Sequence, residues 1–82
     1  MSVSSTYDIY RAANELISRL ADAGRENEAA MLRSAIENGS TGTEILMALR
    51  FNMERIAAAG AIEPDDALFS VLRREIERAL RA

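Results

Sequence analysis

The chain carries few of the side chains that usually do chemistry in proteins. Its 82 residues include no histidine and no cysteine, so the commonest general base and metal ligand and the thiolate nucleophile are missing. A two-carboxylate active site needs acids that face each other in a cleft. The acids here are expected on outer helix faces and in first helical turns. The sequence therefore predicts no enzyme activity, no catalytic residue and no cofactor.

Acidic clusters could still bind a metal ion. Carboxylate sites in helical bundles combine Glu with a Glu-x-x-His pattern, which needs a histidine. The densest acidic group, Glu63, Asp65 and Asp66, lacks the alternating ligands and the glycine of a calcium loop. We interpret this group as a helix start, where acids stabilise the positive end of the helix dipole. No metal is predicted.

The stretch NGSTGTE, residues 38–44, is the most distinctive local pattern. Glycines, hydroxyls and a helix start are features of anion sites. A phosphate loop, however, needs a fuller glycine pattern and a lysine; the chain has no lysine, and Glu44 would repel an anion. We interpret the stretch as a helix stop followed by a helix cap, and predict no small-molecule ligand. A cap does not require Gly42, which suggests a close backbone contact there.

Ala35, Gly39 and Ile45 stand at the spacing of a small residue, a turn glycine and a buried aliphatic residue. This spacing resembles the helix-turn-helix family and implies a DNA-binding regulator. Three positions that the motif fills with apolar residues are polar here: Ser34, Asn38 and Ser40. The DNA-facing helix would present Thr43, Leu46, Met47 and Arg50. Because bases and phosphates are read by polar and basic groups and the net charge is −3, nucleic acid is not favoured.

Four helical segments are expected to position these residues, at 6–23, 25–38, 42–59 and 64–81. Apolar residues recur at helical spacing in each segment and should face a common core. The first stripe is Ile9, Ala13, Leu16, Ile17 and Leu20; the second is Ala29, Leu32, Ala35 and Ile36; the fourth is Leu68, Phe69, Leu72, Ile76, Ala79 and Leu80.

Short polar and glycine signals mark the ends of these segments. Two pairs fit the capping-box pattern: Ser5 with Asp8, and Thr41 with Glu44. Three glycines are expected to end helices, with Gly39 in the left-handed conformation after Asn38: Gly24, Gly39 and Gly60. Pro64 is expected at the first position of the last helix, with Asp65 and Asp66 in its first turn.

The expected fold is all-α, a compact four-helix domain formed by residues 1–82. The short links are compatible with a bundle or with a partly orthogonal array. Only Gly39 and Ser40 separate the middle segments, which favours some orthogonal character. A domain of this size has modest stability, so self-association is the available supplement once disulfides and metals are excluded.

The third segment is apolar on two faces. At 100° per residue, one continuous face is formed by Ile45, Leu46, Leu49, Met53, Ile56, Ala57 and Gly60, and this face is expected in the core. Met47 and Phe51 fall near 200° and 240° from Ile45, on the far side. Such a helix is either buried within its own fold or covered by a partner. We predict an interface at Met47 and Phe51, with Leu46, Arg50 and Val71 at its margin.

These observations favour a small protein-interaction module without catalytic activity, either a homodimer or an accessory subunit of a larger partner. A small helix-turn-helix DNA-binding regulator is the alternative. All ten basic residues are arginine and alanine is abundant, which indicates a GC-rich bacterial source. The N-terminus does not resemble a signal peptide, and the longest apolar run, 56–62, is far short of a membrane span. A cytoplasmic location is expected.

Overall fold

The computed structural model describes residues 6–81, with side chains from residue 8 onward. Four helices make up this part of the chain, and it contains no strand: α1 (Thr6–Asp22), α2 (Glu26–Asn38), α3 (Gly42–Ala58) and α4 (Ala67–Arg81). The predicted all-α, four-helix fold is therefore confirmed.

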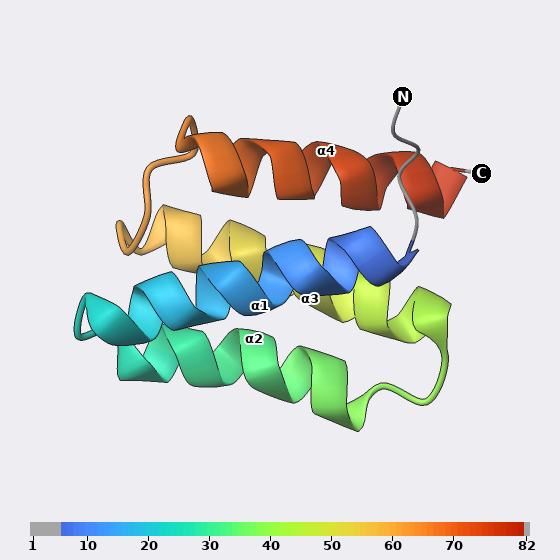
Figure 1. The fold of residues 1–82 in the computed structure, drawn as a ribbon, viewed down its shortest axis with the longest axis horizontal. Helices are drawn as coiled ribbons and strands as arrows, with labels where there is room; N and C mark the ends of the chain where they lie inside the picture. The colour runs from blue at the N-terminus through green and yellow to red at the C-terminus, as the bar shows by residue number, and fades with distance from the viewer. Residues whose placement is uncertain (1–5, 82) are drawn as a thin grey trace.

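The helices form an antiparallel bundle in which successive helices run in opposite directions (Figure 1). Helix α1 packs against α2 and α4, and α3 packs against the same two helices, so the four close into a ring. Of the two arrangements left open by the sequence, the structure adopts the bundle, so the orthogonal character inferred from the short link between the middle helices is wrong.

The short link between α2 and α3 is long enough for this arrangement because the backbone at both of its ends is extended. Gly39 has φ −76° and ψ 139°, and Thr41, the residue before α3, has φ −133° and ψ 163°. Three residues can span up to roughly 10 Å, which matches the distance between the axes of packed helices. The link thus allows α3 to return alongside α2.

The core consists largely of the apolar stripes that the sequence predicts, although four predicted members are only partly buried against it: Ile36, Leu68, Ala79 and Leu80. Its fully or nearly fully buried side chains come from all four helices: Ile9, Ala13, Leu16, Ile17, Leu20, Ala29, Leu32, Ala35, Leu46, Leu49, Met53, Ile56, Phe69, Leu72 and Ile76. Burial of one such large side chain stabilises the fold by about 1.5–3 kcal/mol. Tertiary packing of these stripes is therefore the main source of helix stability.

Two glycines end their helices as predicted. Gly24 and Gly60 both have φ +81°, a conformation that glycine adopts without steric cost. In each case the following amide bonds back across the last turn, from Arg25 N to Leu20 O at 2.8 Å and from Ala61 N to Ile56 O at 3.0 Å. This is the Schellman pattern, which satisfies carbonyls that the helix end leaves free.

The prediction for Gly39 is wrong in its geometry. Its φ of −76° is not left-handed, because the chain continues as an extended link into α3. Glycine is needed there for a different reason. A Cβ at this position would collide with the Ile45 side chain and lie 3.2 Å from Ile45 N. The absent side chain thus allows the link to approach the first turn of α3.

The start of α3 follows the predicted cap with one change. Thr41 Oγ1 accepts a hydrogen bond from Glu44 N at 3.1 Å, as in a capping box. The returning bond goes one residue further back, because Glu44 Oε1 accepts from Ser40 N at 2.9 Å. Both bonds hold the link against α3. The other predicted pair, Ser5 with Asp8, involves Ser5, which lies outside the described residues.

Helix α4 begins later than predicted, at Ala67 rather than Pro64. Pro64 instead lies in a turn closed by a bond from Asp66 N to Glu63 O at 3.0 Å. Asp66 is the residue that caps the helix, since its Oδ1 accepts from Phe69 N at 3.1 Å. Proline fits the second position of such a turn as well as it fits the first position of a helix, and the aspartate cap decides between them.

Candidate functional site

The predicted interface residues lie in two different environments. Met47 and Phe51 are 51% and 61% exposed on the outer face of α3, and Arg50 beside them is exposed. Burial of Met47 and Phe51 within the monomer, one of the two readings of the sequence, is therefore wrong. Leu46 is only 6% exposed and belongs to the core, so its placement at the margin of the interface is also wrong.

Helix geometry explains this division of α3. Leu49 and Met53 are buried in the core, and Phe51 is two residues from each of them. Two residues correspond to about 160° around a helix, so Phe51 points away from the core. Met47 is one turn earlier than Phe51, and residues at this spacing are neighbours on a helix surface. We call the surface formed by Met47 and Phe51 the outer α3 face.

An arginine lies against the exposed ring of Phe51. The guanidinium carbon of Arg55 is 5.6 Å from the ring centroid, within the range of a cation–π contact. The contact leaves most of the ring in solvent, since Phe51 remains 61% exposed. The outer α3 face therefore combines an accessible aromatic ring, a flexible thioether and a nearby positive charge.

Val71, 42% exposed on α4, does not join this face. Arg73 reaches toward α3, where its Nη1 lies 3.7 Å from Glu54 Oε2. Val71 is two residues before Arg73, and so about 160° around α4 from it. It points away from α3, and the prediction that it borders the interface is wrong.

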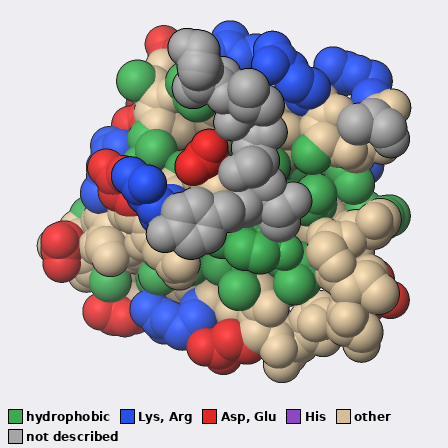
Figure 2. All heavy atoms as spheres, turned by 45° about the vertical axis from the view of Figure 1, so that its right-hand side comes forward, with side chains coloured by type: hydrophobic (Ala, Val, Ile, Leu, Met, Phe, Trp, Pro, Cys, Tyr) green, Lys and Arg blue, Asp and Glu red, His purple; other side chains and the backbone are tan. Residues whose placement is uncertain are grey.

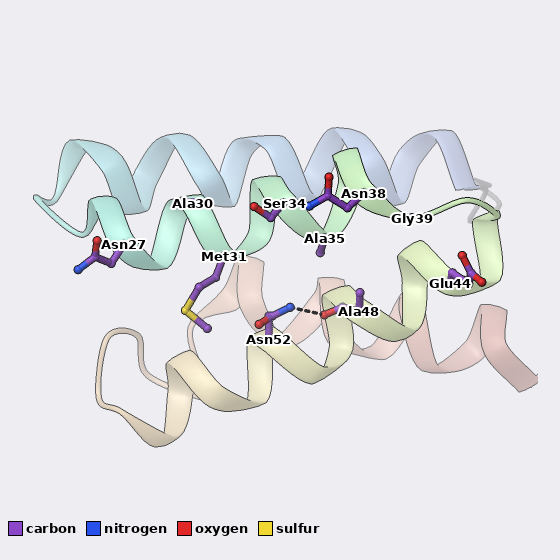
Figure 3. Close-up of a pocket in the computed structure, with 10 residues that line it drawn as sticks. All are labelled: Asn27, Ala30, Met31, Ser34, Ala35, Asn38, Gly39, Glu44, Ala48 and Asn52. Carbon is purple, nitrogen blue, oxygen red and sulfur yellow. Dashed lines mark hydrogen bonds between the residues drawn. The ribbon is translucent and has the colours of Figure 1, made fainter.

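Open hollows lie on both sides of the outer α3 face. The hollow toward α2 has a volume of about 620 Å³ and combines small side chains with amides, as Figure 3 shows. Asn52 lies in it and donates from Nδ2 to Ala48 O at 2.9 Å, and Met31 projects from α2 toward the same space (Figure 3). The hollow toward α4, about 510 Å³, is lined by Thr43, Met47, Arg50, Glu77, Leu80 and Arg81. Helix α3 is thus a ridge between two hollows.

The end of the bundle where α1 and α3 begin comes forward in Figure 2. Apolar side chains gather in the middle of this view, beside the residues that are not described. Arginine side chains follow its upper edge, which α4 forms (Figure 2). Arg74, Arg78 and Arg81 are all exposed, and their spacing of four and three residues places them on one side of α4.

Asp66 joins the start of α4 to the end of α1. The amide of Phe69 donates to its carboxylate, and this bond is the largest cause of a lowered pKa for Asp66. Arg19 lowers the pKa further, since its guanidinium donates to Asp66 Oδ2 at 2.8 Å, while partial burial acts in the opposite direction. The sequence placed Asp66 near the helix start but offered no sign of the partner on α1. This Arg19–Asp66 contact joins the start of α4 to α1.

The link at residues 38–44 is poorly suited to hold an anion. The carboxylate of Glu44 already accepts from Ser40 N, so it occupies a backbone donor that an anion would use and adds negative charge. Gly42 lies against α1, where a Cβ at this position would be 4.0 Å from Tyr10 Oη. That distance is an ordinary contact, so the link does not require glycine at position 42.

The α2–α3 pair also departs from helix-turn-helix geometry. That motif sets its two helices at about 90–120°, whereas α2 and α3 lie side by side in opposite directions (Figure 1). Within residues 6–81, no group of three or more acidic residues is placed to hold a metal ion. None of the helices described is both long enough and apolar enough to cross a membrane.

Comparison with protein families, with curated proteins and with solved structures found no match for this chain.

Proposed function

We propose that this protein is a small interaction module without catalytic activity, whose contact surface is the outer α3 face. One observation carries the proposal: Met47 and Phe51 are both more than half exposed, one turn apart on the same helix. Among the described side chains, the only other large apolar one that is similarly exposed is Val71, which points away from α3. A cytoplasmic location and a bacterial source stay predictions from the sequence.

The chemistry of the outer α3 face suits contact with another protein. Aromatic, methionine and arginine side chains are enriched at protein interfaces, where they combine a large contact area with polar margins. Methionine adapts to irregular partner surfaces because its side chain is unbranched and polarizable. Phe51 and Met47 supply the apolar centre, and Arg50 and Arg55 supply the margin.

DNA binding is the second candidate, and one observation favours it: the three exposed arginines on α4, Arg74, Arg78 and Arg81. Three phosphate contacts give weak binding that falls steeply with salt, and the net charge of the chain is −3. The apolar pair on α3 would have no role in such a complex. Salt dependence separates the two functions, because apolar association weakens little as salt is added.

Site-specific photo-crosslinking in cells of the source organism tests the proposal. A p-benzoylphenylalanine in place of Phe51 should give a covalent adduct of one discrete mass on irradiation. The same residue in place of Val71 is the matched control, since that position is also exposed and apolar but lies on the far side of α4. The proposal fails if position 51 gives no adduct, or if both positions give the same adducts.

A further inference from the structure

The outer side of α3 has a charge pattern that complements its own reverse. From the start of the helix it carries an acid, two apolar residues and a base, Glu44, Met47, Phe51 and Arg55, while the exposed Glu54 beside them is directed toward Arg73 of α4, whose Nη1 lies 3.7 Å from Glu54 Oε2. Read backwards, the order becomes base, apolar, apolar, acid. We infer that the partner of the outer α3 face is a second copy of this chain, with the two α3 helices antiparallel across a two-fold axis. This inference rests on the proposed function.

The register follows from the positions of the apolar pair. A two-fold axis at the level of Leu49 lies two residues after Met47 and two before Phe51. Met47 of one copy therefore faces Phe51 of the other, and each contact occurs twice, as a two-fold interface requires. Leu49 itself stays in the core of its own copy. The exposed ring and thioether thus cover each other.

The same axis brings the charges together. Glu44 lies five residues before the axis and Arg55 six residues after it, a mismatch of one residue, or about 1.5 Å along the helix. Both lie about 20–40° from Phe51 in the same direction around α3. A two-fold axis perpendicular to the helices places each flank of one α3 against the same flank of the other, so the flank with Glu44 and Arg55 meets its own copy. Glu44 of each copy then faces Arg55 of the other, whereas a parallel pair would place Glu44 against Glu44.

The margins of the pair are compatible with this arrangement. Arg50 lies about 100° around α3 from Phe51 in the opposite direction, where it shares the hollow toward α4 with Glu77. The two copies of Arg50 therefore stay at the edge of the contact. Helix α3 has 17 residues and is about 25 Å long, so the interface falls at the small end of specific interfaces. A dissociation constant on the order of micromolar is expected.

Charge reversal tests the register, with oligomeric state measured by sedimentation velocity on the purified full chain. Wild-type protein should sediment as a species of twice its 9.0 kDa mass. Glu44→Arg and Arg55→Glu should each weaken the dimer by roughly tenfold or more, because each places like charges together twice. An equimolar mixture of the two variants should dimerise again, since both contacts of the mixed pair then join Arg to Glu.

Recovery of the dimer on mixing would show that the single variants lost the interface contacts and not their folded structure. Glu44→Arg removes the bond to Ser40 N, so circular dichroism first establishes that each variant is helical. The double variant Glu44→Arg with Arg55→Glu should also recover the dimer, and its recovery does not depend on mixing. A dimer unchanged by either reversal, or unrestored by both mixing and the double variant, would overturn the inferred register.

A wild-type chain that stays monomeric at a few hundred micromolar, well above the expected dissociation constant, would overturn the second-copy inference. The crosslink from position 51 then decides whether the proposed function survives. An adduct with a different protein in cells would keep the outer α3 face as an interaction surface, whereas no adduct would remove both proposals.

Discussion

The two phenylalanines of this chain share a local pattern but have opposite environments. Each has an arginine four residues later, and each guanidinium carbon lies 5.6 Å from its ring centroid: Arg55 over Phe51 and Arg73 over Phe69. Phe69 is fully buried, whereas Phe51 is 61% exposed. The spacing therefore sets the ring–arginine contact, and the face of the helix decides whether the ring supports the fold or is available to a partner.

Truncation of the two rings should show the largest difference. Phe69→Ala removes a fully buried ring and should lower the free energy of unfolding by about 3–5 kcal/mol, a large part of the stability of a small domain. Phe51→Ala should change it by less than about 0.5 kcal/mol, as for other exposed positions. Urea unfolding, measured at a protein concentration low enough to keep the chain monomeric, provides the comparison. Equal losses for both variants would contradict the division between core and surface.

The link at residues 39–41 positions the start of α3 and so determines the direction in which Phe51 points. A substitution at Gly39 tests this dependence. Gly39→Ala places a Cβ against the Ile45 side chain and 3.2 Å from Ile45 N. The overpacking should cost about 1–3 kcal/mol. Gly42→Ala is the matched control, because its nearest neighbour, Tyr10 Oη, would lie at 4.0 Å. Gly42→Ala should be neutral or slightly stabilising in thermal unfolding. An equal loss of stability for both variants would show that contact with Ile45 is not the reason for glycine at position 39.

The inward position of Phe69 depends in turn on Asp66, which caps α4. Substitution of Asp66 should cause the smallest loss of stability of the changes considered. Asp66→Ala removes the acceptor for Phe69 N and the partner of Arg19, and should cost about 1 kcal/mol. In the folded state the pKa of Asp66 lies below its ordinary value, mainly because the Phe69 amide donates to the carboxylate. A lowered folded pKa means that this stabilisation is present above the unfolded pKa and is lost as the pH falls through the folded value.

We therefore expect wild-type stability to decrease below about pH 4, with a smaller decrease in Asp66→Asn, which keeps an oxygen acceptor but does not titrate. Melting temperatures measured from pH 2 to 8 test this. Between pH 6 and 8 the midpoint should move by less than about 5 °C, because the chain has no histidine or cysteine to titrate there. An identical acid response in both proteins would mean that Asp66 does not contribute to it.

The sequence correctly predicted the features that depend on near neighbours in the chain. Helical periodicity marked all four segments and placed Leu16, Leu32 and Ile76 in the core. The hydroxyl of Thr41 and the glycine at position 24 marked a helix start and a helix end. These features are local because a cap or a Schellman turn is completed within about six residues.

Features that depend on distant neighbours were decided only by the tertiary structure. Gly39 is extended because α3 returns beside α2, and Ile45 then fills the space of its missing side chain. Helix α4 starts at Ala67, after a turn that Asp66 closes, and Arg19 on α1 donates a hydrogen bond to Asp66. Periodicity assigned one apolar face of α3 to the core but could not tell whether the second face would also be covered within the fold. In a ring of four helices each helix has two neighbours, so one side of α3 stays outside, and Phe51 and Met47 lie on it.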